Sequence, residues 1–164
     1  MRVSSANSPR LSLAALLATK PGHQPRLIYR THRGRRGGMS RRKGFTEADY
    51  AALLDAAHRQ LSGPIVLVWD NLNTHISAAM AELIAARPWL TVLQLPPYAH
   101  ELNPVEPVWS HLKRSLANLT KHTIGELTAL VKTRLRRMQY RPGLLVGFLA
   151  YTGLDFGPLS NTRP

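Results

Sequence analysis

The feature that most constrains the fold is an uninterrupted apolar run, Ile65 to Trp69, which ends in Asp70. Because apolar residues fill both alternating positions, the run predicts a strand that is buried on both faces. Thr74 follows where it would cap a helix. A carboxylate at the carboxyl end of a central strand lies where open α/β sheets bind their ligands. The alternative is that Asp70 and Asn71 only form a turn, which both residue types favour.

A helix and a second strand complete a βαβ unit around this run. The pattern predicts a helix over residues 76–86 and a strand over residues 90–95, closed by Pro96-Pro97-Tyr98. Short links of this kind produce parallel strands with a right-handed crossover. We therefore expect Asp70 and the Pro96-Pro97-Tyr98 turn to lie at the same edge of the sheet.

The flanking segments predict an α/β fold with a mixed sheet. Residues 11–19 and 26–31 indicate a β-hairpin, although the first of them would equally tolerate a helix. Thr46 begins a helix with an apolar stripe, which ends before Gly63-Pro64. The remaining pattern indicates a helix after Asn103, a basic amphipathic helix over residues 123–138, and a short apolar helix over residues 144–151.

Glu106 stands at the start of the helix that follows Asn103. Asn103 is a good N-cap, Pro104 suits the first helical position, and Glu106 comes three residues after the cap. This spacing forms a capping box, in which the Glu106 carboxylate closes back on the backbone and has no other role. The alternative is that Glu106 is a second acid at the same sheet edge as Asp70.

The charge of the chain is strongly basic and uneven. There are 22 Lys and Arg against 9 Asp and Glu in 164 residues, for a net charge of +13, and no acid precedes Glu47. Such an excess suits a polyanion, most simply nucleic acid, unless the basic residues are only solvated. With no cysteine, disulfides and thiolate zinc sites are excluded. No apolar run reaches the roughly 18 residues that span a bilayer.

Three segments together carry a resemblance to a known family: Trp69 to His75, Leu95 to Ala99, and Leu102 to Lys113. In type, order and spacing, with 35 residues between Asp70 and Glu106, they resemble DDE transposases of the IS630 type, related to the Tc1/mariner group. The resemblance covers residues 9–154, with residues 1–8 as an irregular, disordered or remnant amino terminus and 155–164 as a flexible tail. It implies an RNase H-like fold, a mixed sheet flanked by helices, truncated at its amino terminus and lacking the first strand.

The resemblance also implies roles for individual residues. Asp70 and Glu106 would be the second and third catalytic acids and would hold Mg²⁺ or Mn²⁺, two ions in the complete enzyme, for DNA cleavage and strand transfer. Oxygen ligands suit these metals, and two ions stabilise both the attacking and the leaving oxygen. Asn71, His75 and Asn103 would support the acids or contact substrate. The expected DNA contacts are Arg33, Arg35, Arg36, Arg41, Arg42, Lys43 and Lys113.

The family pattern needs a further Asp on its first strand, and this sequence has no acid in that region. We therefore expect the isolated chain to be weakly active or inactive, as a remnant, an internal reading frame or a frameshift partner. The expected partners are transposon-end and target DNA, an upstream-encoded transposase portion and a second copy in a homodimer, and no membrane. The expected location is the bacterial cytoplasm, at the nucleoid. The alternative function is a non-enzymatic, basic nucleic-acid-binding protein.

Overall fold

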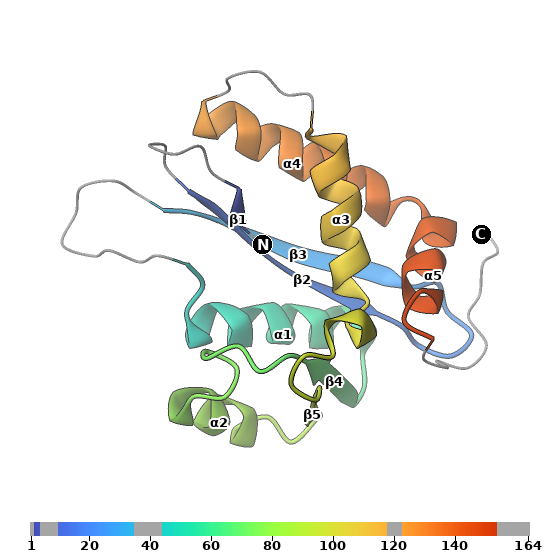
Figure 1. Cartoon of the computed structure of the whole chain (residues 1–164). Coiled ribbons are helices and arrows are strands. Elements are labelled where there is room, and N and C mark those ends of the chain that lie inside the picture. The colour runs from blue at the N-terminus through green and yellow to red at the C-terminus, as the bar shows by residue number, and fades with distance from the viewer. Residues whose placement is uncertain (1, 4–9, 35–43, 118–122, 154–164) are drawn as a thin grey trace.

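A computed structural model describes residues 2–3, 10–34, 44–117 and 123–153 (Figure 1). The elements in chain order are β1 (Arg2–Val3), β2 (Leu11–Ala18), β3 (Arg26–Arg33), α1 (Glu47–Leu61), β4 (Ile65–Trp69), α2 (Ala78–Ala85), β5 (Leu90–Gln94), the 3-10 turn η1 (His100–Leu102), α3 (Val105–Ser115), α4 (Ile124–Gln139) and α5 (Pro142–Ala150). The described strands form a three-stranded antiparallel sheet, β1-β2-β3, and a two-stranded parallel sheet, β4-β5. No described helix is both long and apolar enough to cross a membrane.

The predicted amino-terminal hairpin is confirmed. β2 pairs along its whole length with β3, from Leu11 opposite Arg33 to Ala18 opposite Arg26. In the connecting turn, Gly22 has a φ of 74°, a conformation that glycine adopts without a steric penalty. Arg2 and Val3 pair with the first two residues of β2, so a short strand stands where irregular chain was expected.

The βαβ unit is also confirmed, since β4 and β5 are parallel and α2 lies between them in the chain. The prediction that the first of these strands is buried on both faces is wrong. Leu67 and Trp69 are buried, whereas Val66 is 63% and Val68 is 38% exposed. The buried face packs on Leu54 of α1, and no described helix covers the other face to the same extent.

The start of α2 differs from the prediction. Ser77, not Thr74, is the N-cap, and its hydroxyl accepts a hydrogen bond from the backbone N–H of Met80 at 3.2 Å. The physical reason is a turn after β4, in which His75 N donates to Leu72 O at 2.7 Å. This turn delays the helix, so Thr74 is too early to cap it. Thr46, by contrast, caps α1 as predicted.

Helix α1 covers one face of both sheets. Its Leu53 and Ala57 pack on Ala14 and Ile28 of the hairpin, and its Leu54 packs on the β4-β5 sheet. The opposite face of the hairpin packs on α3, α4 and α5, as Figure 1 shows. Each fully buried leucine in this interior contributes about 1.5–3 kcal/mol of hydrophobic stabilisation. The sheets are therefore held side by side by a shared helix, because no described strand pairs with both β2 and β4.

Candidate active site

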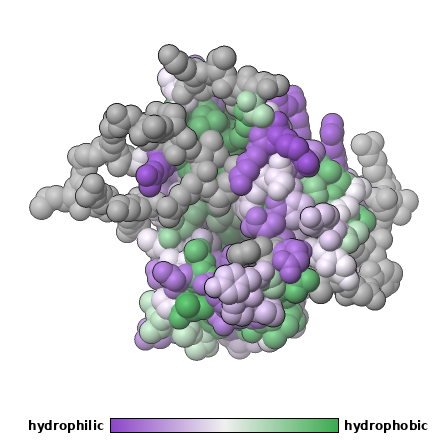
Figure 2. All heavy atoms as spheres, in the orientation of Figure 1, coloured by the Kyte–Doolittle hydropathy of each residue, from purple (hydrophilic) through white to green (hydrophobic). Residues whose placement is uncertain are grey.

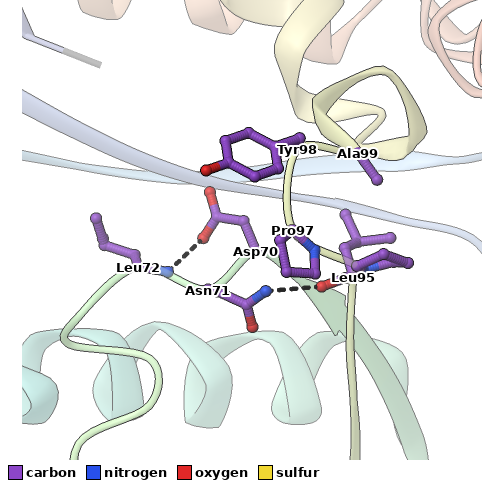
Figure 3. Close-up of a pocket in the computed structure, with 8 residues that line it drawn as sticks. Asp70, Asn71, Leu72, Leu95, Pro97, Tyr98 and Ala99 are labelled. Carbon is purple, nitrogen blue, oxygen red and sulfur yellow. Dashed lines mark hydrogen bonds between the residues drawn. The ribbon is translucent and has the colours of Figure 1, made fainter.

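A pocket of about 340 Å³ lies at the carboxyl ends of β4 and β5 (Figure 3). It is lined on one side by the residues that follow β4 and on the other by those that follow β5: Asp70, Asn71, Leu72, Leu95, Pro96, Pro97, Tyr98 and Ala99. The prediction that Asp70 shares a sheet edge with the Pro96-Pro97-Tyr98 turn is confirmed. Parallel pairing of β4 with β5 brings the two segments together.

The carboxylate of Asp70 is held by its own loop. Its Oδ1 accepts a hydrogen bond from Leu72 N at 3.3 Å and lies 2.9 Å from Nδ1 of His75. The same Nδ1 is 3.2 Å from the backbone oxygen of Asp70. Because both oxygens are acceptors, Nδ1 carries the proton and donates to them. The Asp70 side chain is 40% exposed and that of His75 only 10%, so a half-buried imidazole orients an accessible carboxylate.

The imidazole of His75 is itself fixed by two aromatic rings. It stacks on Trp69 with centroids 4.1 Å apart and an interplanar angle of 3°. The ring of Tyr50 meets it edge-on at 4.7 Å. Nε2 of His75 and Nε1 of Trp69 are buried and have no hydrogen-bond partner among the described residues. Ring packing and the hydrogen bonds of Nδ1 therefore set the orientation of the imidazole together.

Asn71 joins the two sides of the pocket. Its Nδ2 donates a hydrogen bond to Leu95 O at 2.8 Å, drawn as a dashed line in Figure 3. This bond links the loop after β4 to the last residue before the proline pair. Asn71 therefore holds the pocket walls in place.

Glu106 lies in the first turn of α3, but the predicted capping box does not form. Asn103 Oδ1 accepts a hydrogen bond from Val105 N at 3.1 Å, and Glu106 N donates to the backbone oxygen of Asn103 at 3.0 Å. The helix begins at Val105 with Pro104 as its N-cap, one residue later than predicted, so the box is out of register. No described residue forms a hydrogen bond or ion pair with the exposed Glu106 carboxylate, and Glu106 does not line the Asp70 pocket.

The other predicted site residues are spread over the chain. Arg33 is exposed at the end of β3, and Lys113 is exposed on α3. Trp109, on the same helix, is 7% exposed and belongs to the core. The remaining predicted DNA contacts lie outside the described residues: Arg35, Arg36, Arg41, Arg42 and Lys43.

Tyr98 is a pocket residue to which the sequence reasoning gave no role. It is 90% exposed and has a φ of 66°, a left-handed conformation that is unfavourable for a bulky residue. In Figure 3 its ring lies beside Asp70 at the mouth of the pocket. The available signal was an aromatic residue directly after two prolines at a sheet edge.

The carboxylate oxygens of this site are the type of ligand that a divalent metal ion prefers, but the described side chains that could supply them are too few. Asp70 and Glu106 offer the carboxylate oxygens that Mg²⁺ and Mn²⁺ prefer. Among the described residues, however, no group of three His, Cys, Asp or Glu side chains could hold a metal ion.

The family description "DDE superfamily endonuclease" matches residues 19–130, a segment that contains both Asp70 and Glu106. The search of curated proteins gave no match. Among solved structures, a Mos1 transposase catalytic domain with raltegravir and Mg has a TM-score of 0.59 at 15% identity, covering 96% of this chain and 82% of that one. A Mos1 mariner paired-end complex with Mn has a TM-score of 0.58 at 15% identity, over 94% of this chain and 47% of that one.

The structural likeness confirms the predicted RNase H-like α/β fold, which the Mos1 catalytic domain shares. At this level of identity it establishes the fold only. The family match extends over more than half of the sequence, and this chain belongs to the DDE superfamily of endonucleases.

Proposed function

We propose that the chain is the catalytic-domain portion of a DNA transposase of the IS630 type, related to the Tc1/mariner group, that acts on transposon-end and target DNA. The observation that carries this proposal is Asp70, an oriented and accessible carboxylate in a pocket at the carboxyl ends of two parallel strands. Support comes from the family match over the region that contains both acids. Related folds have been solved with Mg, with Mn and with transposon ends.

In this proposal, Asp70 and Glu106 hold a divalent ion, Mg²⁺ or Mn²⁺. When bound, the ion supplies Lewis-acid stabilisation of the charge that develops on the oxygens of a phosphodiester. The chain's own residues prepare the site for it. His75 and Leu72 N orient one oxygen of Asp70, Asn71 fixes the opposite wall, and Glu106 has no described partner that would compete for its carboxylate.

We further propose that this site needs one more acid and is weakly active or inactive without it. Two carboxylates bind a metal ion less tightly than three and constrain its geometry less. An Asp supplied by an upstream-encoded portion of the transposase would complete the set. Among the described strands, β1 pairs only with Leu11 and Ser12 of β2, so the rest of that edge of β2 is available for it, beside the helix α1 that also packs on the β4-β5 sheet.

Metal binding tests the proposal without requiring turnover. We expect Mn²⁺, followed by electron paramagnetic resonance, to bind one site on the purified chain, and Asp70→Asn to weaken it by about tenfold or more. Glu106→Gln should do the same, whereas Glu101→Gln, an exposed acid nearby on η1, is the matched control. If Asp70→Asn and Glu101→Gln bind Mn²⁺ as the unmodified chain does, the proposed metal site is wrong.

The second candidate function is a non-enzymatic, basic nucleic-acid-binding protein. It is favoured by the net charge of +13 and by the lack of a third described metal ligand. A pure binding protein gains nothing from an oriented carboxylate, which repels phosphate unless a metal ion bridges them. For such a protein, Asp70→Asn would tighten DNA binding equally with and without Mn²⁺. For the proposed transposase portion, Mn²⁺ would tighten binding only while Asp70 is intact.

A further inference from the structure

A second hollow, of about 110 Å³, lies between α3, α4 and α5, and its polar lining is mostly basic. We call it the arginine pocket; its residues are His111, Ser115, Arg134, Arg137, Met138, Arg141 and Leu144. Figure 2 shows hydrophilic surface gathered over the upper part of α3 and the adjoining part of α4. None of these residues belongs to the Asp70 pocket.

Two elements bring three arginines together here. Arg134 and Arg137 are three residues apart in α4, which places them on adjoining positions of one side of the helix, and Arg141 is the N-cap of α5, directly after the end of α4. Met138 lies on the same side and is 3% exposed. The apolar stripe of α4 therefore brings the arginines to the edge of the core, where α3 and α5 meet it.

No described residue offers these arginines an acidic partner. The ion pairs of the described chain are His75 with Asp70 and Arg87 with Asp55, both in other regions. Nε of Arg134 is buried and has no hydrogen-bond partner among the described residues. A buried N–H donor without an acceptor costs about 1–3 kcal/mol.

Packing of the aliphatic stems would explain why one arginine lies at the edge of a core. It does not explain three guanidinium groups around one hollow with no anionic side chain of the described residues among them, because like charges repel. The carboxyl end of α4 offsets part of this repulsion through its dipole, an effect worth less than about 1 kcal/mol at a surface. The remaining charge favours an external anion.

We propose that the arginine pocket binds one backbone phosphate of a DNA duplex. This inference rests on the proposed function, in which DNA is the partner. A phosphodiester offers two non-bridging oxygens that share one negative charge, and guanidinium groups bind such oxygens in pairs of parallel hydrogen bonds. Ser115 and His111 add further polar contacts around the same hollow. Because the contact is to the backbone, it positions DNA without reading its sequence.

The test compares two double variants that remove the same charge. Arg137→Gln with Arg141→Gln changes two exposed pocket residues, and Lys132→Gln with Arg136→Gln changes two exposed residues of α4 outside the pocket. Binding of a labelled duplex is measured by fluorescence anisotropy in EDTA. We expect about tenfold weaker binding for the pocket pair, with a salt slope smaller by about one. The control pair should lose less than about threefold.

His111 provides a readout that is specific to the pocket. Burial, together with the nearby Arg114 and Arg141, lowers the pKa of His111 below its ordinary value. A phosphate among the arginines would offset their charge, so DNA should raise the pKa of His111 in an NMR titration. Equal losses in the two double variants, or a response of His111 to inorganic phosphate but not to DNA, would overturn the proposal. Because EDTA excludes metal chemistry, a failed Mn²⁺ experiment at Asp70 leaves this result interpretable.

Discussion

At the scale of residues, His75 and His58 are two half-buried imidazoles that each stack on a tryptophan. His58 lies on Trp89 with centroids 4.1 Å apart, but only His75 also contacts a carboxylate. Stacking alone therefore cannot account for the position of His75. The difference makes His58 an internal control for the positioning role of His75.

We expect His75→Ala to weaken Mn²⁺ binding by about tenfold, the usual effect of losing a group that orients a metal ligand. His75→Asn should restore most of the affinity, because its amide donates from nearly the same place as Nδ1. Calorimetric titration measures both, and thermal unfolding checks that the fold survives. His58→Ala removes a comparable stack and should leave Mn²⁺ affinity unchanged. If His58→Ala weakens binding as much as His75→Ala, the role of His75 is only structural.

At the scale of elements, the strands and helices were largely predictable because each has strong local signals. Alternating residues and turn formers predicted the hairpin, and the apolar run ending at Asp70 predicted β4. Helix starts were less predictable because side chains competed for the same backbone groups. Thr74 looked like a cap until the turn that positions His75 displaced the helix start to Ser77. In the same way, Asn103 bonds Val105 instead of closing a box with Glu106.

The rest of the candidate site depends on contacts between distant elements, which no local pattern reports. Asn71 and Leu95 are joined by a hydrogen bond across two loops. Val66 is exposed because no described helix covers its face of β4 as α1 covers the other face. Asp70 was predictable as a strand-end acid, whereas its hydrogen bond with His75 required the folded turn. The position of Tyr98 after two prolines was visible in the sequence, but its left-handed backbone and its exposure at the pocket required the folded structure.

An ion pair joins α1 to the segment after α2. Arg87 meets Asp55 with two hydrogen bonds, Nε to Oδ1 and Nη2 to Oδ2, each 2.7 Å long. These bonds lower the pKa of Asp55 below its ordinary value of 3.8. A lowered folded-state pKa stabilises the fold at pH values above the unfolded-state pKa, and this stabilisation is lost as pH falls through the folded-state pKa.

We expect Asp55→Asn to lower the free energy of unfolding by no more than about 1 kcal/mol at neutral pH, because the pair is partly exposed to solvent. The difference from the unmodified chain should shrink as pH falls below 3.8. Urea unfolding across that pH range measures it. Glu82→Gln on α2, an exposed acid without a described partner, should change stability by less than about 0.5 kcal/mol at any pH. A pH-independent effect of Asp55→Asn would contradict the ion-pair explanation.

At the scale of the whole molecule, two features oppose each other. The net charge of +13 keeps copies of the chain apart at low ionic strength. The edge of β4 that pairs with no described strand, and the side chains of Val66 and Leu93, which are 63% and 54% exposed, favour association by strand pairing. Salt screens the repulsion between the charged copies, since the Debye length is only about 8 Å at physiological ionic strength. It leaves the association by strand pairing intact.

The chain should therefore self-associate more as salt rises, while its binding to DNA weakens. Val66→Lys places a charge on the exposed face of β4 and should keep the chain monomeric, because lysine on an edge strand opposes pairing. Light scattering coupled to size-exclusion chromatography, run at increasing NaCl, measures the association. Ala79→Lys adds the same charge on the exposed side of α2 and should not prevent it. If both variants block association equally, net charge alone governs it, and the open edge of β4 contributes nothing.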